Sequence, residues 1–188
     1  MTQSLHILGI SGSLRAGSYH TALLRTISDL MPADVQLTIF DIKSLPMFNP
    51  DLHSTPTDDA QTFLDAVREA DGLIFASPEY NHSLTGAMKN AIDWGSRRYN
   101  GQPSALSGKP AGIITAATGG YGGVRGYQHM RDVAFATNMH VLTRPMIMVP
   151  HVREKFDNNL QLIDETTRGF LQEFVAALNA WVRKINQD

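Results

Sequence analysis

The sequence contains no cysteine among its 188 residues. Disulfides, thiolate zinc sites, iron–sulfur ligation and a redox-active Cys-x-x-Cys pair are therefore all excluded. Any redox chemistry that this chain carries out must depend on a bound cofactor.

Strong charge of either sign is also missing. Lys and Arg together number 16 against 18 Asp and Glu, and the formal net charge is -2. No run of basic residues concentrates positive charge at one place. Because nucleic acids are bound mainly through such positive charge, we expect no nucleic-acid partner.

Long apolar segments are absent as well. The longest apolar stretches fall short of the roughly 18 residues that identify a membrane-spanning helix. The first residues, Met1 to Ser4, lack the basic flank and the small-residue cleavage site of a signal peptide. We therefore expect no membrane partner and a cytoplasmic location.

The residues that are present predict one α/β domain over residues 1–188, without linker, internal repeat or low-complexity tract. Apolar runs of strand length alternate with longer segments of helical period, which is typical of a parallel sheet covered by helices. Strands are predicted at Leu5–Ile10, Val35–Phe40, Gly72–Ser77, Ala111–Thr115 and Met146–Val149. Helices are predicted at Ser18–Met31, Thr57–Ala70, Thr85–Arg98, Val124–Asn138 and Thr166–Ile185, with Thr57 as an N-cap.

The loop after the first predicted strand has the composition of a phosphate site. It is rich in serine and glycine from Ser11 to Ser18 and leads into a helix, whose N-terminus favours anions. Gly12 and Gly17 have the spacing of a nucleoside-triphosphate loop, but Ser18 stands where that loop needs lysine. The Gly-x-Gly-x-x-Gly spacing of a dinucleotide fold is also absent.

These exclusions leave a site for a terminal phosphate monoester such as that of FMN. Ser11, Ser13 and Ser18 would donate hydrogen bonds with the backbone amides, and Arg15 would supply the charge. A serine- and glycine-rich turn without a ligand is the alternative. His20 is expected to pack or to cap the helix.

The loop after the third predicted strand reads Pro78-Glu79-Tyr80-Asn81 and is followed by Lys89-Asn90-Ala91-Ile92-Asp93-Trp94. Together with Gly12-Ser13-Leu14-Arg15 and Ser18, these motifs resemble the NADPH-dependent FMN reductase family, which includes chromate and quinone reductases and azoreductase-like enzymes. The resemblance extends over nearly the whole chain.

The resemblance implies a flavodoxin-like fold with five parallel strands in the order 2-1-3-4-5 and helices on both faces. It implies tightly bound, non-covalent FMN, NADPH or NADH as co-substrate, and reduction of quinones, chromate or other metal ions, azo compounds or free flavin. Ser11, Ser13, Arg15 and Ser18 would hold the phosphate, and Pro78 to Asn81 would line the ring and ribityl chain. The cofactor-binding residues that we predict are Ser11, Ser13, Arg15, Ser18, Tyr19, His20, Pro78, Glu79, Tyr80, Asn81, Ser83, Thr115, Ala116, Thr118, Gly119 and Gly120.

Three positions depart from that family's pattern. His20 stands where relatives usually have Asn, and Thr85 stands where they usually have Pro, although threonine is suited to cap the helix that follows. After Pro145 many relatives have Glu and this chain has Met146, which bears on a subunit contact.

A third loop, Thr115 to Gly126, contains five glycines. We expect its amides to face the pyrimidine end of the flavin, where they would stabilise negative charge on the reduced ring. No side chain is expected to act as a catalytic acid or base, because hydride passes directly between nicotinamide and flavin. No metal site is expected from the spacing of His82, His129, His140 and His151, which fits packing or exposure instead.

Several questions stay open at the level of sequence. The rival function is a flavodoxin-type electron carrier, which would share the fold and the phosphate loop. A homo-oligomer, dimer or tetramer, is implied by the resemblance, with Trp94, Tyr99 or Tyr121 either near a neighbouring subunit or in the core. Arg97, Arg98 and Arg125 are candidates for the 2′-phosphate of NADPH, but the choice between NADPH and NADH is undecided.

Overall fold

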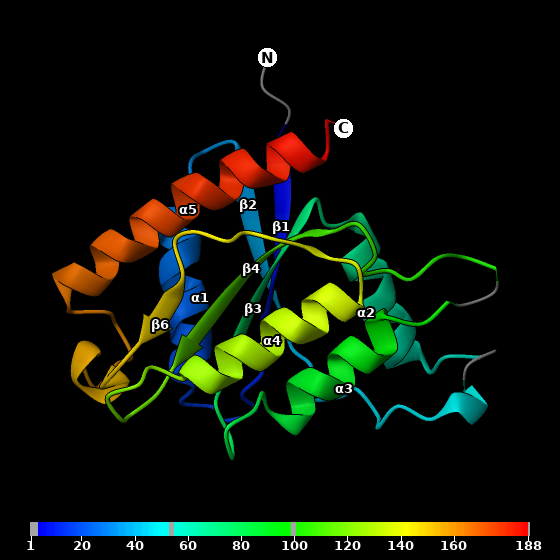
Figure 1. The fold of residues 1–188 in the computed structure, drawn as a ribbon, viewed down its shortest axis with the longest axis horizontal. Helices are drawn as coiled ribbons and strands as arrows, with labels where there is room; N and C mark the ends of the chain where they lie inside the picture. Colours follow the sequence, from blue (N-terminus) through cyan, green and yellow to red (C-terminus); the bar gives the residue numbers. More distant parts are fainter. Residues whose placement is uncertain (1–3, 53–54, 99–100, 188) are drawn as a thin grey trace.

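The chain folds into a three-layer α/β structure with a central parallel sheet (Figure 1). The computed structural model describes residues 4–52, 55–98 and 101–187. The strand order is β2-β1-β3-β4-β5, and β6 also pairs with β4. The predicted flavodoxin-like fold, with strand order 2-1-3-4-5 and helices on both faces, is confirmed.

Four long strands make the body of the sheet. They are β1 at Leu5–Ser11, β2 at Val35–Phe40, β3 at Gly72–Pro78 and β4 at Pro110–Ala116. Every residue of β3 and β4 is buried, as expected for parallel strands that are covered on both faces. Ser11 pairs with Ala76, and Pro78 pairs with Ala116. The carboxyl ends of β1, β3 and β4 therefore lie at the same edge of the sheet, where all three candidate loops begin.

The fifth strand differs from the prediction. The edge next to β4 is divided between β5 at His140–Val141, which was not predicted, and β6 at Ile147–Val149, which corresponds to the predicted Met146–Val149. Both pair in parallel with β4. β5 has only two residues, and one of them is an exposed histidine, so it has no apolar pattern that the sequence analysis could detect.

In the described part of the chain, five helices cover the two faces of the sheet (Figure 1). α1 at Tyr19–Leu30 and α5 at Glu165–Ile185 pack on one face. α2 at Asp58–Glu69, α3 at Gly86–Gly95 and α4 at Val124–Ala136 pack on the other. The 3₁₀ helices η1 at Pro50–Leu52 and η2 at Val152–Lys155 lie in connecting segments.

The helix boundaries follow from local chemistry. Thr57 caps α2 as predicted, since its side chain accepts a hydrogen bond from the backbone N–H of Ala60. α3 ends at Gly95, three residues before the predicted Arg98. Gly95 packs so closely on Leu106 that a Cβ there would be 2.9 Å from the leucine Cγ. None of the helices in the described part of the chain has both the length and the hydropathy that a membrane crossing requires.

Candidate functional site

A pocket of about 220 Å³ opens at the carboxyl edge of the sheet, and we call it the central pocket. It is formed by the loop after β1 with the start of α1, the loop after β3, the loop after β4, and η2. Its lining residues are Ser13, Arg15, Ser18, Tyr19, His20, Pro78, Glu79, Tyr80, Ala116, Ala117, Thr118, Val152 and Arg153.

The loop after β1 is fixed at its start by close backbone packing. The N–H of Gly12 donates to the carbonyl of Ala76 at 2.8 Å, and the hydroxyl of Thr85 donates to the carbonyl of Gly12 at 2.7 Å. A Cβ at position 12 would lie 2.8 Å from the hydroxyl oxygen of Ser77, so only glycine fits here. The same Thr85 hydroxyl caps α3 by accepting from the N–H of Met88, which gives this departure from the family pattern a structural role.

The start of α1 presents hydrogen-bond donors and a cation to the central pocket. Ser18 is the N-cap, its hydroxyl accepts from the N–H of Thr21 at 3.2 Å, and its side chain is almost fully buried. Arg15 is exposed and forms no ion pair within the described residues. A helix N-terminus with a free guanidinium beside it attracts an anion.

His20 is the buried titratable group of the central pocket. The residue is 6% exposed, and its Nε2 atom has no hydrogen-bond partner among the described residues. Desolvation lowers the pKa of His20 to about 4, against a smaller opposing effect of the Ala116 backbone. His20 is therefore neutral at neutral pH, and its Nε2 is an unpaired polar atom buried behind the pocket lining, which is unusual for a folded protein. The prediction that His20 packs against the fold is confirmed.

The loop after β3 closes on itself in a tight turn. The N–H of Tyr80 donates to the carbonyl of Ser83 at 2.9 Å, and the N–H of Ser83 donates back at 3.0 Å. Asn81 and His82, between them, have φ angles of 52° and 65°. Asparagine tolerates this left-handed conformation better than most residues, so the turn itself accounts for an asparagine at this position.

Glu79 connects the loop after β3 to the start of α4. Its Oε2 accepts from the N–H of Arg125 at 2.9 Å and from the N–H of Gly126 at 3.0 Å. The N-cap of α4 is Gly123, which has no side chain to supply this bond. Glu79 was predicted to line the flavin ring; it does line the central pocket, but its carboxylate is engaged with α4.

The glycines of the third loop are partly explained by packing. Gly122 and Gly123 have φ angles of 60° and 82°, and a Cβ at Gly122 would lie 2.9 Å from the backbone of Met148. The hydroxyl of Thr115 donates to the carbonyl of Gly122 at 2.9 Å and is fully buried. This loop is therefore tied to the sheet at Gly122 and Gly123, while Gly119 and Gly120 remain exposed.

The structure brings together ten of the predicted residues in the central pocket, namely Ser13, Arg15, Ser18, Tyr19, His20, Pro78, Glu79, Tyr80, Ala116 and Thr118. Outside its lining lie Ser11, Asn81, Ser83, Thr115, Gly119 and Gly120. Ala117, Val152 and Arg153 also line the central pocket and were not predicted. The sequence could have indicated them, because they follow predicted strands and the carboxyl ends of all parallel strands lie at one edge of the sheet.

The aromatic residues proposed for a subunit contact differ in burial. Trp94 is fully buried, and its indole N–H donates to the carbonyl of Pro46 at 2.8 Å, so it belongs to the core. Tyr121 is 79% exposed and stays a candidate for such a contact. Tyr99 lies outside the described residues. Among the described residues, no three His, Asp or Glu side chains converge on a point that could hold a metal ion.

Comparison with known proteins gives the family. Residues 5–154 match the model of the NADPH-dependent FMN reductase family. The chain belongs to this family. An NAD(P)H-dependent FMN reductase of Pseudomonas aeruginosa is 39% identical over 186 residues, which cover 98% of this chain and 99% of that protein. A quinone reductase of Pseudomonas putida is 36% identical over 184 residues, with 97% of both chains covered.

The solved structures agree with this family assignment. FerB, a flavoenzyme NAD(P)H:(acceptor) oxidoreductase from Paracoccus denitrificans, superposes with a TM-score of 0.87 at 28% identity and covers 96% of this chain and 98% of its own. The family resemblance seen in the phosphate loop and in Pro78 to Asn81 is thus confirmed. This member of the FMN reductase family is an NAD(P)H-dependent reductase.

Proposed function

We propose that the central pocket binds FMN and that this FMN reductase family member uses it to reduce quinones with electrons from NADPH or NADH. The observation that carries the proposal is the convergence of a helix N-terminus, a serine hydroxyl and a free cation in one pocket, from Ser18, Ser13 and Arg15. Such a donor set fits a phosphate monoester. The names of the relatives support FMN and quinones as the classes of ligand.

The residues of the central pocket divide into two groups under this proposal. Ser13, Ser18, Arg15 and the first amides of α1 would hold the phosphate. Pro78 and Tyr80 would lie against the ring from one loop, and Ala116 to Thr118 would lie against it from another. Arg153, from η2, adds a second guanidinium at the rim and is a further candidate for the phosphate.

Bound FMN would supply the redox chemistry by accepting hydride from the nicotinamide and passing the electrons on. The chain's own residues would orient the two substrates in turn at the same open face of the central pocket. Two substrates that alternate in one pocket give parallel lines in double-reciprocal plots, whereas a ternary complex gives intersecting lines. Chromate or other metal ions, azo compounds and free flavin are proposed as further acceptors, to be compared with quinones in the same assay.

The experiment that tests cofactor binding is flavin retention. We expect the purified protein to be yellow or to take up added FMN, and Arg15→Ala and Ser13→Ala to weaken FMN binding at least about tenfold, because each removes a phosphate contact. Arg131→Ala, which changes an exposed arginine outside the central pocket, is the matched control. Undiminished FMN affinity in both site variants would refute the proposal.

The rival electron carrier is separated by the next measurement. The FMN-loaded protein is mixed anaerobically with NADPH or NADH, and flavin absorbance is followed. Rapid bleaching supports a reductase, while a protein that keeps its oxidised spectrum with both nucleotides would be a carrier that needs another reductase.

We further propose that residues 1–188 form one domain, that the protein is cytoplasmic, and that it assembles as a dimer or tetramer. Exposed apolar side chains at Tyr121, Phe135, Met146 and Phe170 are available for subunit contacts. Met146 cannot make the ion pair or hydrogen bond of a glutamate at this position, so any contact here would be apolar. Sedimentation velocity gives the assembly state directly.

A further inference from the structure

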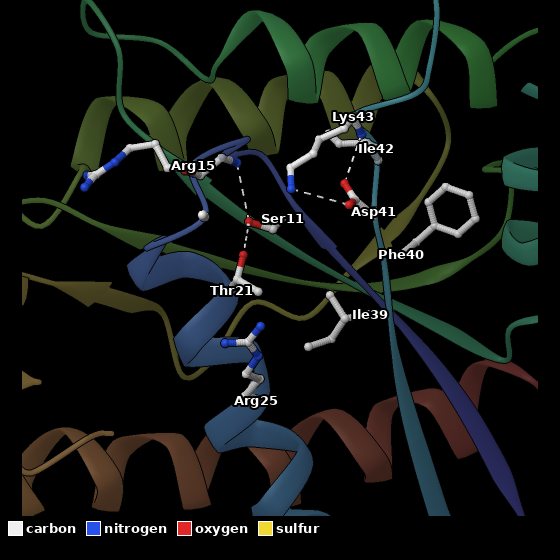
Figure 2. A pocket seen from close by; sticks show the side chains of 11 residues that line it. Ser11, Arg15, Thr21, Arg25, Ile39, Phe40, Asp41, Ile42 and Lys43 are labelled. Atoms are coloured by element: carbon white, nitrogen blue, oxygen red, sulfur yellow. Dashed lines mark hydrogen bonds and ion pairs between the residues drawn. The ribbon is translucent and has the colours of Figure 1, made fainter. Parts of the chain in front are cut away.

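A second cavity, of about 270 Å³, lies across the phosphate loop from the central pocket (Figure 2). It is bounded by the loop after β1, by α1 and by the end of β2 with the residues that follow. We call it the Arg25 pocket; its lining residues are Ser11, Ser13, Arg15, Ala16, Thr21, Arg25, Ile39, Phe40, Asp41, Ile42 and Lys43. Because Ser13 and Arg15 line both cavities, the two are adjacent across a single turn of chain.

The Arg25 pocket carries an excess of positive charge. Three cationic residues, Arg15, Arg25 and Lys43, line it together with one carboxylate, that of Asp41, although the guanidinium of Arg15 points away from the cavity in Figure 2. Lys43 lies 3.6 Å from Asp41, but both side chains are more than half exposed, so this ion pair is weak. Arg25 forms no ion pair with any carboxylate in the ranges that the structure describes. An anion entering the pocket would therefore meet cations that are not already neutralised.

Hydroxyl groups lie between these cations. Figure 2 shows Lys43 and Arg25 on opposite sides of the Ser11–Thr21 pair. The Ser11 oxygen accepts from the Thr21 hydroxyl at 3.0 Å and from the N–H of Ser13 at 3.4 Å. Since the oxygen of Ser11 is used as an acceptor, its own proton is available to an anion in the pocket.

An apolar wall adjoins the charged part of the pocket. Ile39, at the end of β2, points to the same side as Arg25 in Figure 2, and the buried Ile42 lies beside Lys43. A cavity with cations and hydroxyls on one side and aliphatic carbon on the other matches a ligand that joins a phosphate to a flat aromatic base. Inorganic phosphate alone would leave the apolar wall unused.

We propose that the Arg25 pocket binds the phosphorylated adenosine end of NADPH, with Arg25 and Lys43 holding the 2′-phosphate. This inference depends on the proposed function, in which the nicotinamide end occupies the central pocket. One elongated dinucleotide can then extend over the phosphate loop and reach both cavities. The pocket would make this reductase favour NADPH over NADH, which lacks the 2′-phosphate.

The arginines suggested by the sequence are less suited to this role. The guanidinium of Arg97 stacks over the ring of Phe48 at 5.1 Å and lies 4.0 Å from Asp93. Arg97, Arg98 and Arg125 line neither the central pocket nor the Arg25 pocket. Arg25 was missed because it lies mid-helix, outside every loop that the motifs single out.

The test compares the two nucleotides in steady state with FMN-loaded protein and a quinone acceptor. We expect the wild type to have a higher kcat/KM for NADPH, and Arg25→Ala and Lys43→Ala each to lower the NADPH/NADH ratio of kcat/KM about fivefold, as for an exposed charge pair. The ratio should also fall with added salt, because exposed charges are screened. Arg131→Ala is the control that should leave the ratio unchanged. A ratio that is the same in the wild type and in both site variants would overturn the inference.

A binding measurement identifies the source of the adenosine phosphate. Calorimetric titration of the FMN-loaded protein with 2′,5′-ADP should show binding that Arg25→Ala weakens, and 5′-AMP should bind less well. If instead the flavin-free protein binds FAD more tightly than FMN, and Arg25→Ala removes only that advantage, the pocket serves a flavin dinucleotide and the NADPH assignment is wrong. If neither nucleotide reduces the bound FMN, the proposed function itself fails, which is distinct from a failure of the Arg25 pocket alone.

Discussion

The contact of Glu79 with α4 offers the sharpest test of how the site is held together. One carboxylate oxygen accepts two backbone N–H groups in the first turn of a helix whose own N-cap is glycine. The informative changes are Glu79→Ala, which removes the acceptor, and Glu79→Gln, which keeps a carbonyl oxygen but removes the charge.

The magnitude follows from what each substitution removes. A hydrogen bond to a charged group contributes about 1.5 to 3 kcal/mol, and loss of a capping side chain costs about 0.5 to 2 kcal/mol. Glu79 is half-buried, so solvent reduces the electrostatic part. We expect Glu79→Ala to lower the free energy of unfolding by about 2 kcal/mol. Glu79→Gln should lose only the charge–dipole part, about 0.5 to 1 kcal/mol.

The assay is urea unfolding at fixed protein concentration, with and without saturating FMN, checked by thermal unfolding. For a chain of this size a loss of about 2 kcal/mol lowers Tm by about 4 to 8 °C. Because Glu79 also fixes the loop after β3, FMN affinity should fall in the same order, with Glu79→Ala below Glu79→Gln.

The matched control is Glu173→Ala, which changes an exposed glutamate within α5. It should alter stability by less than about 0.5 kcal/mol. If Glu79→Ala is no more destabilising than Glu173→Ala, the carboxylate does not hold α4 in solution. If Glu79→Gln costs as much as Glu79→Ala, charge rather than the hydrogen bonds carries the effect.

Two further predictions concern residues that border the loop after β1, His20 and Thr85. Because burial lowers the pKa of His20 to about 4 from 6.5, the unfolded chain takes up a proton at a higher pH than the folded chain as the solution is acidified. The contribution of neutral His20 to the free energy of unfolding is fully present above pH 6.5 and is lost as the pH falls toward 4. In urea titrations of the flavin-free proteins, the wild type should therefore lose about 3 kcal/mol more than His20→Asn between pH 7 and pH 4. Equal slopes for the two proteins would contradict this. Thr85→Val should lower the free energy of unfolding by about 1 to 2 kcal/mol and weaken FMN binding, because it removes both the cap of α3 and the hydrogen bond to Gly12. Thr85→Ser keeps both hydrogen bonds and is the control. If the valine and serine variants unfold at the same urea concentration, the hydroxyl has no such role.

Much of the fold was predictable because the local signals and the tertiary structure agree. β3 and β4 are buried along their whole length, so their sequences read as continuous apolar runs between turn residues. Helix starts were predictable where a capping side chain precedes an amphipathic pattern, as at Thr57. β5 was not, because a two-residue strand is formed by pairing with β4 rather than by any pattern of its own.

The site was predictable to the extent that it depends on chain order. Ser13 and Pro78 follow directly from the strand-then-loop pattern, since carboxyl ends of parallel strands share one edge. The engagement of Glu79 with α4 was not predictable, because it joins residues 46 and 47 positions apart through backbone groups that have no sequence signature. Arg25 was missed for a related reason: it enters a cavity from the middle of a helix, where single cations usually face solvent.

Side-chain bonds between loops leave a defined set of groups for the ligand. Thr85 ties the first loop to α3, Glu79 ties the second to α4, and Thr115 ties the third to its own strand. Among the described residues that line the central pocket, the guanidinium groups of Arg15 and Arg153 form no ion pair. Fixed loops keep these two groups in place before a ligand arrives, which lowers the entropy lost on binding. Substitutions of Thr85, Glu79 or Thr115 should therefore reduce the free energy of unfolding and the flavin affinity together. Substitutions of Arg15 should reduce flavin affinity with little change in the stability of the flavin-free protein.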